Sequence, residues 1–197
     1  MKFSNMGTTK HKVFISFHHG DKTIDPRCGQ YWKERFEALF HDYYETVISK
    51  SVQDGDIKDG ILTETTRQKI RDEYIAEATV TVVLIGPQTW KRKHVDWEIS
   101  SSIRDTKNNS RCGLIGILLP TYPNFDAINN TYNPKTIPPR LQKNQECGFA
   151  TIHVWNENPI IVQDWIHDAF ERRDKVTPDN TYPMFVNNRT EDQTQWI

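Results

Sequence analysis

The segment VTVVLIGPQTWKRKHVDWEISSSI, residues 80–103, decides the fold class of this chain. Its first six residues, Val80–Ile85, form an uninterrupted apolar run, which predicts a strand buried on both faces. Gly86 and Pro87 end that strand, and a basic loop then leads into a helix predicted over residues 94–105. A strand followed by a helix in this way is typical of a parallel α/β sheet, in which ligands bind beyond the carboxyl ends of the strands.

The rest of the chain alternates in the same manner. Further strands are predicted at residues 12–17, 46–52, 113–119 and 150–155, and further helices at 30–40, 63–78 and 160–172. This order predicts an α/β, flavodoxin-like, three-layer domain around a five-stranded, mainly parallel central sheet. The first strand then lies beside the 80–85 strand, and the crevice between their carboxyl ends is the expected ligand site.

A length of 197 residues fits one domain. We expect a flexible N-terminus at 1–10, a domain at 11–174 and a polar tail at 175–197 that lies across the domain surface. Within the domain, residues 120–148 contain five prolines and predict an irregular insertion. Loops of this length inside a compact domain are usually functional or poorly ordered.

Composition narrows the function classes. The formal net charge of −1 argues against a nucleic-acid binder, because that affinity comes from excess Lys and Arg. No apolar run is long enough to span a membrane, and the N-terminus lacks the apolar core of a secretory signal. Three cysteines without a C-x-x-C pair argue against a disulfide framework or a cysteine zinc site. We expect a cytoplasmic protein with no metal site.

Glu98 is the most informative polar residue of the opening segment. Val95, Ile99 and Ile103 recur every four residues and should face the sheet, which places Glu98 at the edge of that apolar stripe. A carboxylate there can contact a sugar or stabilise a developing cation. The alternative is an ordinary solvated glutamate, the commoner fate of a helical Glu. Trp97 points away from the sheet and needs cover from a loop or another subunit.

Other candidate groups carry weaker signals. His18 and His19 follow the first strand, where they can contact a nucleotide; adjacent histidines without acidic or cysteine partners are poor zinc ligands. The basic run KRKH at 91–94 either attracts a phosphate or forms a solvated loop. The acidic loop at 54–60 lacks the later glutamate of a calcium loop. Walker A, G-x-G-x-x-G and G-x-S-x-G motifs are absent.

Three segments together resemble a known family: KVFISFHHGD at 12–21, ATVTVVLIGPQTWKRKHVDWEI at 78–99 and GLIGILLP at 113–120. They are similar to TIR-like domains, and most of all to the bacterial TIR-like proteins of Thoeris anti-phage defence, over roughly residues 11–170. The resemblance implies a flavodoxin-like sheet. In enzymatic members of the family it also implies cleavage of the nicotinamide–ribose bond of NAD.

The resemblance also assigns roles to residues. Glu98 matches the catalytic glutamate of the family, and the loop at 54–60 corresponds to one that gates the site and mediates assembly. The expected substrate-binding residues surround that glutamate: Phe17, His18, His19, Gly86 and Trp97. The long segment at 120–148 is expected to shape an acceptor pocket or a partner surface.

The implied function is that of an NAD-consuming signalling enzyme that needs no further cofactor. Water, an atom of the same molecule or a separate small acceptor would give ADP-ribose, a cyclic product or a conjugate. That product would activate a separate effector, with a phage-derived trigger and homo-oligomer formation controlling activity. Two alternatives stay open: a non-catalytic TIR-like interaction module that signals by assembly, and a nucleotide-binding receptor without turnover.

Overall fold

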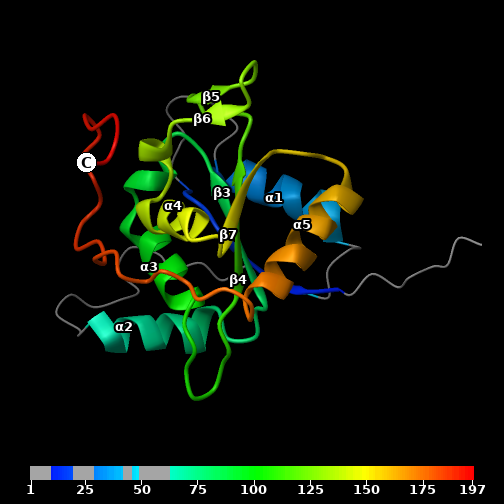
Figure 1. Cartoon of the computed structure of the whole chain (residues 1–197), viewed down its shortest axis with the longest axis vertical. Helices are drawn as coiled ribbons and strands as arrows, with labels where there is room; N and C mark the ends of the chain where they lie inside the picture. The colour runs from blue at the N-terminus through cyan, green and yellow to red at the C-terminus, as the bar shows by residue number, and fades with distance from the viewer. Residues whose placement is uncertain (1–9, 20–28, 42–45, 49–62) are drawn as a thin grey trace, which may run out of the picture.

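The computed structural model describes residues 10–19, 29–41, 46–48 and 63–197, and its centre is one parallel sheet (Figure 1). Five strands form this sheet in the order β2-β1-β3-β4-β7. They are β1 (Lys12–Ser16), β2 (Thr46–Ile48), β3 (Val80–Ile85), β4 (Gly113–Leu118) and β7 (Ala150–Val154). The α/β class, the five parallel strands and the flavodoxin-like order are therefore confirmed.

The centre of the sheet positions the candidate site. Every residue of β3 and β4 is buried, as the apolar run in the opening segment predicts. β3 pairs with β1 on one side, with Ser16 opposite Val83, and with β4 on the other. The switch in strand order thus falls between β1 and β3, where a doubly wound sheet leaves a crevice.

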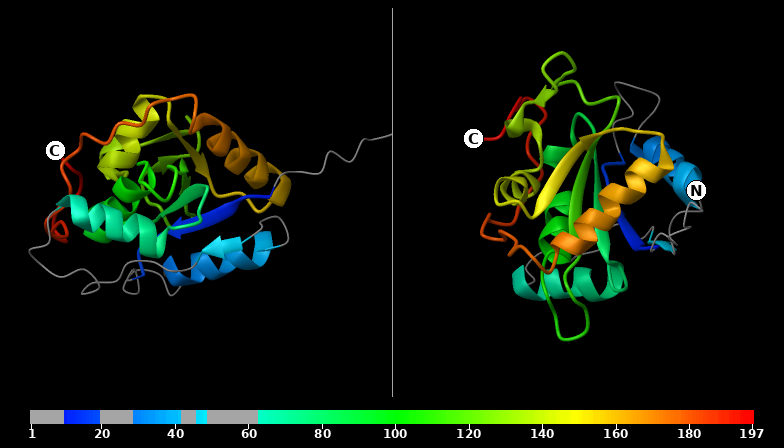
Figure 2. Two further views of the ribbon diagram at one scale, coloured as in Figure 1. Left: turned by 90° about the horizontal axis from the view of Figure 1, so that it is seen from below. Right: turned by 45° about the vertical axis from the view of Figure 1, so that its right-hand side comes forward.

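Two helices, α1 (Gly29–Phe40) and α5 (Pro159–Arg172), cover one face of the sheet (Figure 2). Their inward side chains form one cluster with the strands: Trp32, Phe36 and Phe40 from α1, and Val162, Ile166 and Ala169 from α5. Burying each large apolar side chain stabilises the fold by roughly 1.5–3 kcal/mol. The helical spacing of the apolar residues therefore predicted both helices correctly.

The opposite face carries α2 (Thr63–Lys69), which continues into a π-helical turn η2 (Ile70–Tyr74), together with α3 (Lys93–Ser102) and α4 (Pro139–Glu146). A short 3-10 turn, η3 (Thr89–Lys91), precedes α3. Val95, Ile99 and Ile103 of α3 all pack into the core under β3 and β4. The expected orientation of α3 is confirmed.

The segment at 120–148 is more ordered than its composition predicts. It contains a hairpin of β5 (Phe125–Asp126) and β6 (Thr131–Tyr132), a 3-10 turn η4 (Pro134–Thr136) and the helix α4. The expectation of an irregular insertion is wrong here. The helix was missed because its buried positions include Arg140, Gln142 and Asn144, and polar residues give no hydrophobic periodicity.

The C-terminal tail beyond α5 has no helix or strand, and it runs along the outer side of α4 and α3 (Figure 1). Hydrogen bonds fasten it to both helices, for example from Asn144 of α4 to the Asp179 carbonyl at 2.7 Å. The expected course across the domain surface is confirmed. Residues 1–9 of the expected flexible N-terminus and the loop at 54–60 lie outside the described residues. Within the described ranges, no helix has the length and apolar character needed to cross a membrane.

Candidate active site at the switch between β1 and β3

Glu98 is fully buried on the inner side of α3. Its Oε2 accepts a 2.6 Å hydrogen bond from the hydroxyl of Ser16, the last residue of β1, which is also fully buried. The helical periodicity placed Glu98 only at the edge of the apolar stripe. In the structure Glu98 lies in the interior, against the carboxyl end of β1, because the Ser16 hydroxyl there donates a hydrogen bond to its carboxylate. The alternative hypothesis, that Glu98 is a solvated surface residue, is therefore wrong.

The three residues after Ser16 continue along the same edge of the sheet. Phe17 is buried, and its ring lies 4.2 Å from the ring of His19 between centroids. His94 of α3 donates from Nε2 to the Phe17 carbonyl at 3.2 Å, which ties the end of β1 to the start of α3. The rings of His18 and His94 lie 6.0 Å apart. Two of the elements named in the sequence analysis, the 17–19 loop and the Glu98 helix, thus meet.

Burial favours the neutral form of both histidines of this loop, because it lowers their pKa. Burial, then the neighbouring Arg92 and His94, lower the pKa of His18 to about 3. Burial also lowers the pKa of His19, although a hydrogen bond with Gln30 opposes the shift. A neutral imidazole offers one donor and one acceptor, so the loop can hydrogen-bond a ligand without adding positive charge.

His18 should make the fold sensitive to mild acid. Its folded pKa of about 3 lies below the unfolded value of 6.5, so below pH 6.5 the unfolded state binds a proton that the folded state does not. Stability should therefore fall by roughly 1–2 kcal/mol between pH 7 and pH 5. Denaturant titrations at the two pH values measure this loss. In His18→Asn the fall in stability between pH 7 and pH 5 should be smaller than in the wild type. An unchanged pH dependence would mean that other groups cause this fall.

Gly86 and Trp97 separate in the structure. Gly86 directly follows β3, the strand beside β1, and its N–H donates to the Thr89 hydroxyl at 2.9 Å, which fixes the turn into η3. Trp97 instead faces the tail, where its indole Nε1 donates to the Phe185 carbonyl at 2.7 Å. The structure thus keeps Gly86 near the end of β1 and does not bring Trp97 together with Ser16. Trp97 is covered by the tail together with the buried apolar cluster against which its ring packs, namely Phe14, Ile70, Ile75, Ala78 and Cys112.

A family model described as Thoeris protein ThsB, TIR-like domain, matches residues 14–124, which is more than half of the chain. The chain belongs to this family. Membership assigns it a role in anti-phage defence. No curated protein matches the chain. The match to the TIR-like family includes Ser16, the 17–19 loop, Gly86 and Glu98, whereas α4, β7, α5 and the tail lie beyond it.

The C-terminal tail binds the basic run at 91–94, which leads into α3. The Lys91 ammonium donates to the Glu191 carbonyl at 2.8 Å, and Arg92 pairs with the Glu191 carboxylate at 3.0 Å. The N–H of Lys93, at the start of α3, donates to the Asn188 side chain at 2.9 Å. The run is therefore neither a plain solvated loop nor an open phosphate site, because the C-terminal tail occupies it.

A buried ion pair fastens the outer side of the same helix. Arg140 of α4 and Asp96 of α3 are almost fully buried, and Arg140 Nε lies 2.9 Å from Asp96 Oδ1. Asp96 also accepts the backbone N–H of Phe185 at 3.0 Å. Burial raises the pKa of Asp96, while Arg140 and these hydrogen bonds oppose the rise. Hydrophobic periodicity could not predict this network, since its members are polar groups from α3, α4 and the tail.

Asn180 connects the tail to this network, and its loss should loosen α3. Its side chain accepts from Arg140 Nη1 at 2.7 Å and donates to the Ser100 carbonyl at 2.9 Å. Removing it leaves buried donors and an acceptor unmatched, so Asn180→Ala should cost about 1–3 kcal/mol. Thermal unfolding measures the loss, with the exposed Asn129→Ala in the hairpin as the matched control. Equal melting temperatures for the two variants would contradict a supporting role for the tail.

No group of three His, Cys, Asp or Glu side chains in the described part of the chain is arranged to hold a metal ion. The chemistry that the site can offer comes from one buried carboxylate, a serine hydroxyl and neutral imidazoles.

Proposed function

We propose that this chain cleaves the nicotinamide–ribose bond of NAD, with Glu98 as the catalytic residue, and produces an ADP-ribose-derived second messenger in the cytoplasm. The observation that carries the proposal is the buried carboxylate of Glu98 at the switch between β1 and β3, held by Ser16 at 2.6 Å. NAD is the substrate and no further cofactor is required.

A single carboxylate suits this reaction. Nicotinamide in NAD is already cationic, so the bond from the ribose C1′ to the ring nitrogen breaks with its electron pair going to that nitrogen, and neutral nicotinamide leaves. The ribose then carries oxocarbenium-like positive charge. A carboxylate that accepts hydrogen bonds from the ribose hydroxyls stabilises this charge, and does so more strongly in a site that excludes water. It can then take the proton of the incoming nucleophile.

The neutral loop histidines fit the same chemistry. With its pKa lowered to about 3, His18 adds no positive charge beside a substrate ring and a transition state that are both cationic. An imidazolium in that place would oppose binding and ribosyl-cation formation alike. Phe17, His18, His19 and Gly86 are the substrate-binding residues of this proposal; Trp97 supports α3 through the tail.

Because Glu98 is fully buried, the access of NAD to its carboxylate is the step that is controlled. The substrate must displace the residues that cover the carboxylate, and a ribose hydroxyl can then replace the Ser16 hydroxyl as its donor. This closed arrangement supports control by a phage-derived trigger or by assembly into a homo-oligomer. The product then acts on a separate effector protein.

One observation favours a second candidate, the non-catalytic module that signals by assembly. A buried carboxylate satisfied by a serine hydroxyl is also what a purely structural glutamate requires. The two candidates differ in what Glu98→Gln does to signalling: the enzyme loses its product, whereas the assembly module keeps its function.

Mass spectrometry of NAD-derived products in cells expressing the wild type or Glu98→Gln, with and without phage infection, tests the proposal. We expect infection-dependent nicotinamide and an ADP-ribose-derived product in wild-type cells only. The mass of that product identifies water, an internal atom or a small acceptor as the nucleophile. Protection against phage without any change in NAD products would reject the enzyme and favour the assembly module.

A further inference from the structure

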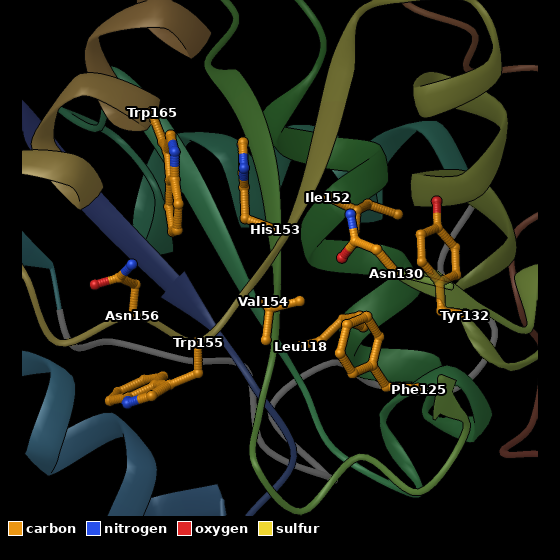
Figure 3. Close-up of a pocket in the computed structure, with 10 residues that line it drawn as sticks. All are labelled: Leu118, Phe125, Asn130, Tyr132, Ile152, His153, Val154, Trp155, Asn156 and Trp165. Atoms are coloured by element: carbon orange, nitrogen blue, oxygen red, sulfur yellow. The ribbon is translucent and has the colours of Figure 1, made fainter. Parts of the chain in front are cut away.

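A cavity of about 340 Å³ lies at the carboxyl end of β7 (Figure 3). Its walls come from β4, β7, α5 and the β5–β6 hairpin: Leu118, Phe125, Asn130, Tyr132, Ile152, His153, Val154, Trp155, Asn156 and Trp165. In the sheet order, β3 and β4 separate β7 from β1, whose end carries Ser16 and meets Glu98. The cavity is therefore distinct from the candidate active site.

Aromatic rings dominate the walls of this cavity. His153 and Trp165 stack face to face, with centroids 4.1 Å apart and planes inclined by 8°. Phe125 and Tyr132 are partners across the hairpin and lie on the other side of β7, with Val154 between the two groups (Figure 3). Flat faces of this kind favour planar ligands, which gain stacking and edge contacts.

No Asp, Glu, Lys or Arg lines the cavity. Its histidine is neutral as well, because burial and the nearby Arg172 lower the pKa of His153 to about 4. A charged ligand would lose its hydration here without meeting an opposite charge, which is unfavourable. The lining therefore selects uncharged molecules.

A hydrogen-bond chain fixes how His153 presents its ring. Arg172 Nη2 donates to the Thr151 hydroxyl at 3.0 Å, and this hydroxyl lies 2.9 Å from His153 Nε2. This contact holds the orientation of the His153 ring, and either the hydroxyl or Nε2 can be its donor, because a hydroxyl oxygen has two lone pairs. Nδ1 is then the ring nitrogen that can hydrogen-bond a ligand, as donor or acceptor according to the tautomer. Asn156 adds amide donors, as its Oδ1 already accepts the N–H of Asn158.

We propose that this cavity binds an uncharged planar nitrogen heterocycle, of the size of nicotinamide or a purine base, whose ring packs on the aromatic walls and whose polar edge hydrogen-bonds His153 Nδ1. The volume is at the lower end of the range of about 300–1,000 Å³ that is typical of small-molecule sites. The proposal does not depend on NAD cleavage at Glu98.

The test uses ¹H–¹⁵N NMR of the wild-type chain titrated with adenine, nicotinamide and nicotinate. Nicotinamide and nicotinate have nearly the same shape and differ by one negative charge. We expect adenine and nicotinamide to shift the indole signal of Trp165, with a Kd on the order of 1 mM, and nicotinate to bind at least about tenfold more weakly. Two results would overturn the proposal: Trp165 shifts with nicotinate as large as those with nicotinamide, or no Trp165 shift at concentrations of adenine and nicotinamide well above about 1 mM.

Two variants locate the contacts. His153→Phe keeps a flat ring but removes the hydrogen-bonding ring nitrogen, and should weaken adenine binding about tenfold. Ile160→Ala, an exposed change on α5 outside the cavity, should leave it unchanged. Repeating the titration with Glu98→Gln separates the two sites: the Trp165 shifts should persist even if NAD cleavage is absent. Shifts confined to the surroundings of Ser16 would instead assign the ligand to the candidate active site.

Discussion

Replacing Glu98 with glutamine is expected to reduce nicotinamide release by at least about 100-fold while the fold survives. The amide removes the negative charge that stabilises the ribosyl cation and the base that accepts the proton of the nucleophile, two effects that each contribute factors of this size. Its carbonyl oxygen can still accept the Ser16 hydroxyl, so the 2.6 Å contact at the end of β1 has a replacement. Nicotinamide release by the activated protein, measured by chromatography, gives the rate.

The matched control is Glu171→Gln on α5. Glu171 is exposed and pairs with Lys175 at 3.0 Å, so the same chemical change should leave both the rate and the melting temperature nearly unaltered. Glu98→Gln should melt close to the wild type as well. Full turnover in Glu98→Gln would remove the proposed role of the carboxylate, and unfolding of that variant would make Glu98 structural.

The parts of this fold that follow hydrophobic periodicity could be predicted from the sequence. The apolar run at 80–85 matches β3 residue for residue, and the four-residue spacing on α3 correctly oriented Val95 and Ile99. Periodicity placed Glu98 at the edge of the apolar stripe, and the expected crevice together with the resemblance to TIR-like domains made it the leading candidate. The full burial of Glu98 was not predicted. Periodicity ranks positions by hydrophobicity, so it cannot identify a buried acid whose carboxylate accepts a hydrogen bond from Ser16.

The support around the site could not be predicted for the same reason. α4 carries Arg140 and Asn144 on its buried side, and the tail binds through backbone groups and through Asn180. Such contacts depend on which polar atoms meet after folding, at separations of 35 residues or more. Composition predicted a polar tail lying across the domain surface, but not the hydrogen bonds by which this tail holds the outer side of the helix that carries Glu98.

Replacing Arg140 with methionine should be the most destabilising of these changes. It leaves the Asp96 carboxylate almost fully buried without its counter-ion, a situation that typically costs about 3–5 kcal/mol. For a chain of this length the melting temperature should fall by roughly 6–20 °C. The control is Arg104→Met, which breaks a pair with the largely exposed Glu64 and should cost no more than about 1 kcal/mol. Thermal unfolding of both variants compares a buried pair with an exposed one.

The pH dependence of the Arg140→Met defect identifies its cause. Burial already raises the pKa of Asp96, and Arg140 is the largest influence that opposes the rise, so its removal must raise that pKa further. A folded-state pKa above the unfolded value means that the folded state keeps a proton which the unfolded state has lost. Stability is then retained at low pH and lost as the pH rises through the raised pKa. The variant should therefore lie closer to the wild type at pH 5 than at pH 8.

The double variant Asp96→Asn, Arg140→Met completes this argument. It has no buried charge to titrate, so its deficit relative to the wild type should be smaller than that of Arg140→Met at pH 8 and should vary less with pH. A deficit that is equally large in the double variant at both pH values would mean that the packing of the Arg140 side chain, rather than its charge, holds α4 against α3. In that case the tail, through Asn180 and Phe185, would remain the main polar fastening on the outer side of the helix.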